Sequence, residues 1–164
     1  MSNDYASERG IPSSPACAKS TLSLRFDGRC LVLSGPKISA YPAVSGRALP
    51  GVQFDYSVNR QRVRDIGPIP SGQYWVQPSQ MWDNAWYRVA APRSVWGNHR
   101  LTIHILPGTQ THGRGGFFIH GGTHDGTAGC INLHGWMDNF VDDIAKATKD
   151  SRDCYVPLSV TYLT

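Results

Sequence analysis

Residues 22–33 read LSLRFDGRCLVL, and this stretch decides the fold class. In its first half, apolar residues at every second position alternate with polar ones, which is the period of a strand with one buried face. Asp27-Gly28 then supplies the positive φ angles that a tight hairpin turn requires, and residues 30–33 resume an apolar run. The stretch therefore predicts a β-hairpin.

Segments of the same character recur along the chain, separated by clusters of Gly, Pro and Asn. One segment differs, because Trp136, Phe140 and Ile144 recur at every fourth position within residues 134–149. We therefore expect a mostly β, α+β fold of antiparallel strands with one substantial helix. The further predicted strands are residues 37–41, 73–77, 86–90, 101–106, 117–120 and 156–162.

The composition is that of an ordinary globular protein. Of the 164 residues, 40% are hydrophobic and 17% are charged, which excludes a disordered chain and suits a single domain. No apolar run approaches the roughly 18 residues that cross a bilayer, so membrane insertion is not expected. The net charge of +4 favours polyanionic partners such as the cell wall. Because the basic residues are scattered, no nucleic-acid partner is expected.

Residues 1–20 are rich in Ser, Pro, Ala and Gly and show no periodicity. They predict a flexible N-terminal leader ahead of a domain that spans residues 21–164. The leader lacks the apolar stretch of a secretory signal peptide. We therefore expect synthesis in the cytoplasm and, for any extracytoplasmic task, export by a route other than general secretion.

The four cysteines form no Cys-x-x-Cys pair, so the usual spacings of zinc ribbons and thioredoxins are absent. One disulfide among Cys17, Cys30 and Cys154 is an option in an oxidising compartment, and free thiols are the alternative. Cys130 is set apart from these three because it lies in a glycine-rich segment.

That segment, residues 115–133, reads GGFFIHGGTHDGTAGCINL. A strand that ends in His120 holds the imidazole rigidly, and glycines allow backbone N–H groups to approach a reacting carbonyl. A cysteine beside glycine is sterically open, and a neighbouring histidine lowers the pKa of its thiol and raises the thiolate fraction. The pattern predicts Cys130 as a nucleophile and His120 as its base.

The same segment resembles the signature of the L,D-transpeptidases (the YkuD-like family). In that family a His-Gly pair is followed, after a spacer, by Ser/Thr-His-Gly-Cys, a hydrophobic residue and Asn or Arg. His120-Gly121 matches the first part, and residues 127–132 match the second. Residues 42–46 and 67–74 look like an earlier strand of the family and its proline-glycine hairpin, so the resemblance covers most of the chain.

Two features depart from the family pattern. Ala128 stands where the family has a histidine two residues before the cysteine, and the spacer after His120 is shorter than usual. Both departures are similar to a branch of compact toxins that the type VI secretion system delivers into the periplasm of rival Gram-negative bacteria.

The resemblance implies a β-sandwich or barrel fold with peptidoglycan tetrapeptide stems as substrate. Cys130 would attack the diaminopimelate carbonyl and release D-Ala, with His120 as base and the Gly121 carbonyl orienting the imidazole. Backbone N–H groups of Gly129 and Cys130 would form the oxyanion hole. Ala128 offers no imidazole to position a bulky acceptor stem. We therefore expect small acceptors to attack the thioester in preference to a second stem: water, which gives L,D-carboxypeptidase activity, and free D-amino acids, which give exchange.

Further residues are candidates for substrate contact. Arg114 suits a substrate carboxylate, because guanidinium and carboxylate pair through two parallel hydrogen bonds. His124, Thr127 and Asn132 lie within the motif itself. A zinc site built from Cys130 and the neighbouring histidines is an alternative, but its spacing matches no familiar pattern. We therefore expect neither a metal nor a cofactor.

The leading hypothesis is an antibacterial type VI effector, whose implied partners are the secretion machinery and a periplasmic immunity protein. The first alternative is a housekeeping L,D-transpeptidase of the producer's own envelope, which forms cross-links. The second is an inactive peptidoglycan-binding module, which would have no need of both His120 and Cys130. A papain-like amidase fits less well, because in those enzymes the cysteine precedes the histidine.

Overall fold

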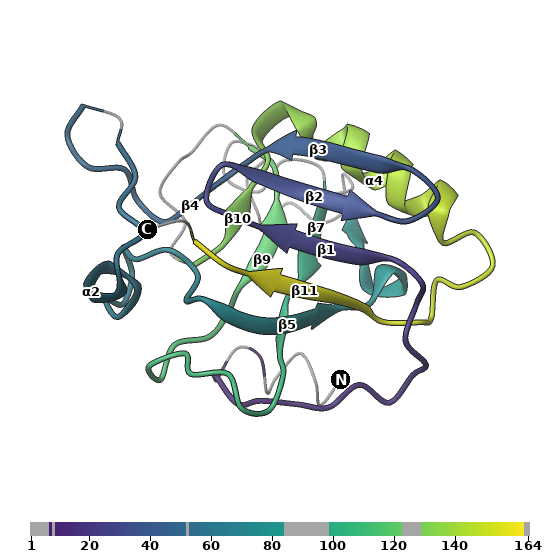
Figure 1. The fold of residues 1–164 in the computed structure, drawn as a ribbon, viewed down its shortest axis with the longest axis horizontal. Helices are drawn as coiled ribbons and strands as arrows, with labels where there is room; N and C mark the ends of the chain where they lie inside the picture. The colour runs from purple at the N-terminus through teal and green to yellow at the C-terminus, as the bar shows by residue number, and fades with distance from the viewer. Residues whose placement is uncertain (1–6, 8, 52, 84–98, 123–128, 163–164) are drawn as a thin grey trace.

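The structure, a computed structural model, describes residues 7, 9–51, 53–83, 99–122 and 129–162 of the chain. These residues form two β-sheets and one main helix, so the predicted mostly β, α+β fold class is confirmed at this level. Figure 1 shows the first sheet at the front of the molecule, the second sheet behind it and the helix along the upper edge.

Within the described residues the two sheets contain six and five strands. In spatial order, the first sheet consists of β3 (Ile38–Pro42), β2 (Cys30–Ser34), β1 (Ser23–Phe26), β11 (Val156–Val160), β5 (Gly72–Val76) and β8 (His104–Ile105). The second consists of β4 (Val44–Ser45), β10 (Ile131–Asn132), β9 (Phe118–His120), β7 (His99–Thr102) and β6 (Trp82–Asp83). The helical segments are α2 (Val58–Gln61), η1 (Pro78–Gln80), η2 (His134–Trp136) and α4 (Met137–Ala147).

The predicted hairpin is confirmed as the antiparallel pair β1–β2, which aligns Leu24 with Leu33 and buries both side chains. At the turn, a carboxylate oxygen of Asp27 accepts hydrogen bonds from the backbone N–H groups of Arg29 and Cys30, each at 2.9 Å. The turn residue thus satisfies the donors that the reversal of the chain leaves without ladder partners.

Two of the described strand pairs are parallel and the others are antiparallel, which agrees with the mostly antiparallel arrangement that the sequence predicts. β1 pairs with β11, so the two ends of the domain lie side by side, and β9 pairs with β10. The predicted strand at residues 101–106 is divided, because β7 belongs to the second sheet and β8 to the first. Ile103 lies between them, fully buried, and its N–H donates to Phe117 at 2.9 Å. The predicted strand at residues 86–90 lies outside the described residues.

The structure confirms a helix within residues 134–149, but one of the three residues predicted on its buried face is exposed. Phe140 and Ile144 are buried, as the period predicts, and Met137 joins them in the core. Trp136 is 50% exposed, although the pattern places it on the buried face. It belongs to the 3-10 turn η2, which has about three residues per turn instead of 3.6, so the α-helical period does not extend back to it.

The described part of residues 1–20 packs along the edge of the first sheet. The Ser13 N–H donates to the Ile105 carbonyl at 2.8 Å, and the Trp75 indole N–H donates to the Ser13 carbonyl at 2.8 Å. Further along, the Ser20 N–H donates to the Tyr155 carbonyl at 2.8 Å. These bonds attach the segment to the body of the domain, and the division of the chain at residue 20 stays a prediction.

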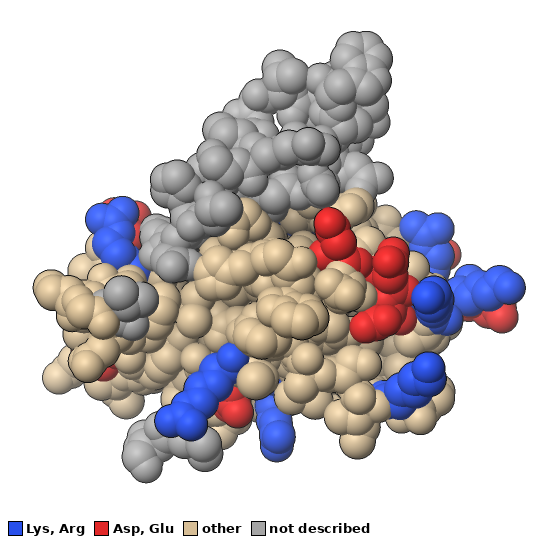
Figure 2. All heavy atoms as spheres, turned by 90° about the horizontal axis from the view of Figure 1, so that it is seen from above, with Lys and Arg blue, Asp and Glu red and all other residues tan. Residues whose placement is uncertain are grey.

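The surface carries both signs of charge. Figure 2 shows acidic side chains near the middle of the face that holds α4, and basic side chains in separate small groups around it. The helix itself carries Asp138, Asp142 and Asp143. No helix in the described part of the chain has the length and apolar character to cross a bilayer. Cys17, Cys30, Cys130 and Cys154 are all free thiols.

Candidate active site

The candidate base lies on β9 of the second sheet, and the candidate nucleophile directly precedes β10, which pairs with β9. Ile119 on β9 and Ile131 on β10 are in register, and both side chains are fully buried in the core. Because successive residues of a strand point to opposite faces, His120 and its partner Asn132 lie on the other face. Cys130 precedes Asn132 by two residues, and its Sγ lies 4.0 Å from the Gly116 carbonyl oxygen, beside the start of β9. The parallel pairing of β9 and β10 thus places Cys130 beside β9, two positions out of register with His120.

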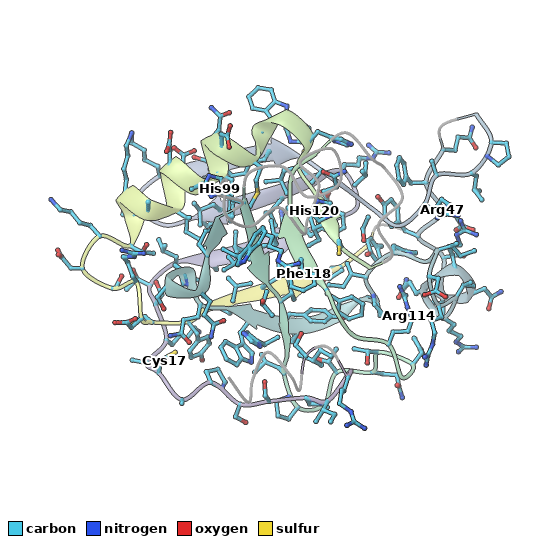
Figure 3. All side chains as sticks on the ribbon, turned by 180° about the vertical axis from the view of Figure 1, so that it is seen from behind. Cys17, Arg47, His99, Arg114, Phe118 and His120 are labelled. Atoms are coloured by element: carbon cyan, nitrogen blue, oxygen red, sulfur yellow. The ribbon has the colours of Figure 1, made fainter. Side chains whose placement is uncertain are left out.

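The imidazole of His120 has a defined tautomer. Nδ1 lies 2.5 Å from the carbonyl oxygen of Gly121, and a carbonyl can only accept a hydrogen bond. Nδ1 therefore carries the proton, and Nε2 carries the lone pair that can take a proton from a thiol. Figure 3 shows His120 and Phe118 together on β9.

Gly121 has no room for a side chain. A Cβ atom at this position would lie 2.8 Å from the His134 carbonyl oxygen and 2.8 Å from Cβ of Met137. Glycine therefore allows the start of the helix to pack directly against the end of β9. The same residue, Gly121, also provides the carbonyl oxygen that accepts the hydrogen bond from Nδ1 of His120.

The oxyanion hole expected from Gly129 and Cys130 needs a correction. The Gly129 N–H already donates to the Gly67 carbonyl at 2.9 Å, so it does not point into an oxyanion site in this structure. Gly129 has a φ of 72°, in the left-handed region where glycine is favoured, and this turn aims its N–H at Gly67. The Cys130 N–H stays a predicted oxyanion donor.

The sequence predicts that Arg114 binds a substrate carboxylate. In the structure its guanidinium instead binds backbone carbonyl groups of the protein. Its side chain is 4% exposed, and its guanidinium donates to the carbonyls of Gln61 at 2.6 Å, Pro68 at 2.7 Å and Gly67 at 2.8 Å. Since Gly67 also accepts from Gly129, this contact ties the loop after α2 to the residue before the nucleophile. Figure 3 shows Arg114 displaced from His120 towards α2.

Asn132, another expected substrate contact, has a local task. It is 4% exposed, and its Oδ1 accepts a hydrogen bond from the His134 N–H at 2.9 Å. His134 has a φ of 50°, which is costly for a residue other than glycine, and this bond helps to hold the turn into the helix. The candidates His124 and Thr127, and the substituted position Ala128, lie outside the described residues.

Burial sets the charge state of the pair. Cys130 is 2% exposed, and burial raises the pKa of its thiol to about 12, although the Phe118 N–H and the charges of Arg100 and Arg114 lower it. His120 is 0% exposed, and burial lowers its pKa to about 4, against the opposing effect of its bond to Gly121. At neutral pH the pair is thus a neutral thiol and a neutral imidazole. This differs from the expectation that a neighbouring histidine lowers the pKa of the thiol and raises the thiolate fraction, because burial has the larger effect.

The depressed pKa of His120 predicts a specific loss of stability in acid. Unfolded His120 takes up a proton near pH 6.5 and folded His120 only near pH 4, so the unfolded state binds more protons between these values. Stability is therefore complete above pH 6.5 and falls as the pH drops to 4, by about 3 kcal/mol from this residue. Urea unfolding at several pH values should show a shallower decline for His120→Gln. Each variant is compared with itself at pH 7, so equal slopes for both proteins would contradict the prediction.

The sequence did not single out Arg100, which pairs in register with His120 from β7. A signal was present, because Arg100 precedes the alternating apolar residues 101, 103 and 105 and so belongs to the face opposite theirs. The pairing with His120 could not be derived without the register of β7 on β9.

Among the residues that the structure describes, no three histidine, cysteine or acidic side chains form a group that could hold a metal ion. Comparison with known proteins finds no family model and no curated protein that matches this chain.

Proposed function

We propose that the chain is a cysteine-dependent enzyme of the L,D-transpeptidase type that cleaves peptidoglycan tetrapeptide stems between diaminopimelate and the terminal D-Ala. The observation that carries the proposal is the position of His120 on β9 and of Cys130 directly before β10, the parallel neighbour of β9, with the Gly121 carbonyl holding Nδ1 of the imidazole. A sandwich arrangement of the L,D-transpeptidase type belongs to the same proposal. The two sheets and the helix after Cys130 are compatible with it.

The reaction follows from the neutral pair. As Cys130 Sγ bonds to the diaminopimelate carbonyl carbon, the thiol proton passes to Nε2 of His120. The tetrahedral intermediate then collapses, the carbon–nitrogen bond breaks, and the His120 proton goes to the departing D-Ala amine. Water or a D-amino acid next attacks the thioester, gives its proton to His120 and releases the thiol, which regains that proton.

Access to the sulfur is part of this proposal. Cys130 is nearly inaccessible in the described conformation, so a stem peptide reaches it only after a local rearrangement. Exclusion of water around the pair also strengthens the electrostatic interactions that stabilise the tetrahedral intermediate.

The biological role in the proposal is that of an antibacterial type VI effector. Its substrate lies outside the cytoplasm, so we place its action in the periplasm of the target cell. The proposed partners are the secretion machinery and a periplasmic immunity protein, which protects the producer from its own toxin.

Mass spectrometry of muropeptides tests the reaction. We expect purified peptidoglycan to lose tetrapeptide stems and accumulate tripeptide stems, and to exchange its terminal D-Ala when another D-amino acid is supplied. Cys130→Ala protein serves as the control and should leave the muropeptides unchanged. Abundant new diaminopimelate–diaminopimelate cross-links without tripeptides would favour the housekeeping enzyme instead. An unchanged muropeptide profile together with retention on sacculi would favour a binding module.

A further inference from the structure

The described part of the N-terminal segment binds the loop that leads into β9. The carbonyl oxygen of Ser7 accepts hydrogen bonds from the N–H groups of Gly116 at 2.9 Å and of Gly10 at 3.0 Å. The Ser7 hydroxyl, which is buried, donates to the Ile103 carbonyl at 2.7 Å. Figure 1 shows the purple N-terminal segment along the lower edge of the molecule, beside this green loop. Ser7 therefore connects the start of the described chain to the loop and to the core.

Two glycines allow the backbones of the segment and the loop to meet directly. A Cβ atom on Gly115 would lie 2.3 Å from the Ser7 carbonyl oxygen and 2.3 Å from the Gly10 nitrogen. A Cβ atom on Gly10 would lie 2.7 Å from the Arg114 carbonyl oxygen. Atoms cannot pack at such distances, so a side chain at either glycine must push the segment and the loop apart.

The same loop also contacts the candidate nucleophile. The Gly116 carbonyl oxygen lies 4.0 Å from Sγ of Cys130, so Gly116 binds the N-terminal segment through its N–H and meets the thiol through its carbonyl. The ring of the next residue, Phe117, packs against Gly129, where a Cβ atom would lie 2.4 Å from the ring. Cys130 is 2% exposed. Displacement of residues 115–117 would therefore remove contacts from the thiol and from the residue before it.

The N-terminal segment is held more weakly than the rest of the domain. Among the described residues the hydrophobic core begins at Leu22, so hydrogen bonds, and not burial of large apolar side chains, attach the segment before it. Its one large apolar residue in the described part, Ile11, is 47% exposed. Segments with few buried apolar contacts open at a lower free energy than the core. Since Ser13 is bonded separately to Ile105 and Trp75, the contacts with the loop can break while the rest of the segment stays attached.

We propose that Ser7 together with residues 9–12 forms a strap that controls access to Cys130. While Ser7 and Gly10 bind the loop, residues 115–117 keep the thiol closed. When these contacts break, the loop moves away and the sulfur becomes accessible. This inference rests on the proposed function in taking Cys130 as the nucleophile, and it identifies the local rearrangement that a stem peptide requires. A partner that binds only the released strap favours the open state.

Alkylation of Cys130 by iodoacetamide in the full chain tests the inference, with the rate measured by peptide mass spectrometry. In Gly115→Ala the new methyl group separates the strap from the loop, so Cys130 should react at least about 10-fold faster than in wild type. Ser7→Ala removes one buried hydrogen bond and should raise the rate about threefold to tenfold. The half-buried Cys30 on β2 is the reference thiol within each sample.

Gly135→Ala is the matched control. A Cβ atom at this position would meet no atom within 4 Å, and neither Gly115 nor Gly135 has a positive φ. Both substitutions therefore add a methyl group to a glycine whose backbone conformation suits alanine, but only the one at Gly115 meets the strap. Gly135→Ala should retain the wild-type alkylation rate of Cys130.

Two further measurements separate release of the strap from other causes. Hydrogen exchange at the Gly116 amide reports the release itself, because this N–H is bonded to Ser7. Faster exchange in Gly115→Ala with an unchanged Cys130 rate would overturn the inference. Low concentrations of urea should hardly change the Cys130 rate, because a local opening exposes little surface. A steep dependence on urea would show that Cys130 reacts only through global unfolding, which would also decide against the strap.

The remaining outcomes are equally decisive. If Gly115→Ala does not fold, a wild-type rate in Ser7→Ala would count against the inference. None of these rates depends on cleavage of peptidoglycan, so their failure would leave the proposed function standing. Protein that opens as expected but cleaves no tetrapeptide stem would refute the proposed function and leave the strap in place.

Discussion

Cys130→Ala is expected to lose at least about 10³-fold in the rate of stem cleavage, because no other group in the proposed reaction can form the thioester. His120→Ala should lose nearly as much. Burial holds the Cys130 thiol protonated at neutral pH, so the base is needed in every turnover. Since nucleophile and base act as one unit, the double variant should be hardly worse than either single one.

Both rate and toxicity report on this prediction. Release of D-Ala from a tetrapeptide gives the rate, and growth of a Gram-negative host gives the toxicity when the protein is exported to the periplasm. Wild-type protein should kill from the periplasm and be tolerated in the cytoplasm, and both single variants should be harmless in either place. Cys17→Ala is the matched control, because this thiol belongs to the N-terminal segment and contacts the side chain of Gln77, away from His120 (Figure 3). Full activity of Cys130→Ala or His120→Ala would refute the assignment.

Arg114→Met is expected to cost about 4 kcal/mol of unfolding free energy, a large fraction of the roughly 5–15 kcal/mol that stabilises a domain. The methionine fills much of the volume but donates no hydrogen bond. The buried carbonyls of Gln61, Gly67 and Pro68 then lose their charged donor, and each one left without a partner is costly. Urea unfolding measures the loss.

The control for this variant is Arg64→Met. Arg64 is exposed, with a single longer bond of 3.3 Å to the Gly113 carbonyl, so its loss should cost less than about 0.5 kcal/mol. A similar small cost for Arg114→Met would show that the three carbonyls find other partners. Because Gly67 also accepts from Gly129, Arg114→Met should reduce activity even at temperatures where it remains folded.

Local patterns predicted those parts of the molecule that depend on local chemistry. The alternation before Asp27-Gly28 predicted the β1–β2 hairpin, because both the strand period and the turn preference are properties of a few neighbouring residues. The four-residue period likewise predicted α4, and it failed only at Trp136, where a 3-10 turn changes the phase. The succession of a strand, a glycine-rich loop and a cysteine singled out His120 and Cys130.

The roles of the arginines depended on contacts between distant segments. A guanidinium in a glycine-rich stretch looks the same in sequence whether it binds a ligand or a backbone. The carbonyls that occupy Arg114 come from residues 61–68, some fifty positions earlier. The N–H of Gly129, expected at the oxyanion, is likewise taken by Gly67.

The sequence by itself determined that the chain is mostly β, where its first hairpin and its main helix lie, and which thiol and imidazole are the candidates for catalysis. Period, turn chemistry and the proximity of residues along the chain carry that information. Only the tertiary structure decided the parallel register of β9 and β10, the protonation state of the pair, and the different positions of Arg114 and Arg100. The physical reason is that register, burial and the occupation of buried donors depend on segments far apart in the chain, which meet only once the core has formed.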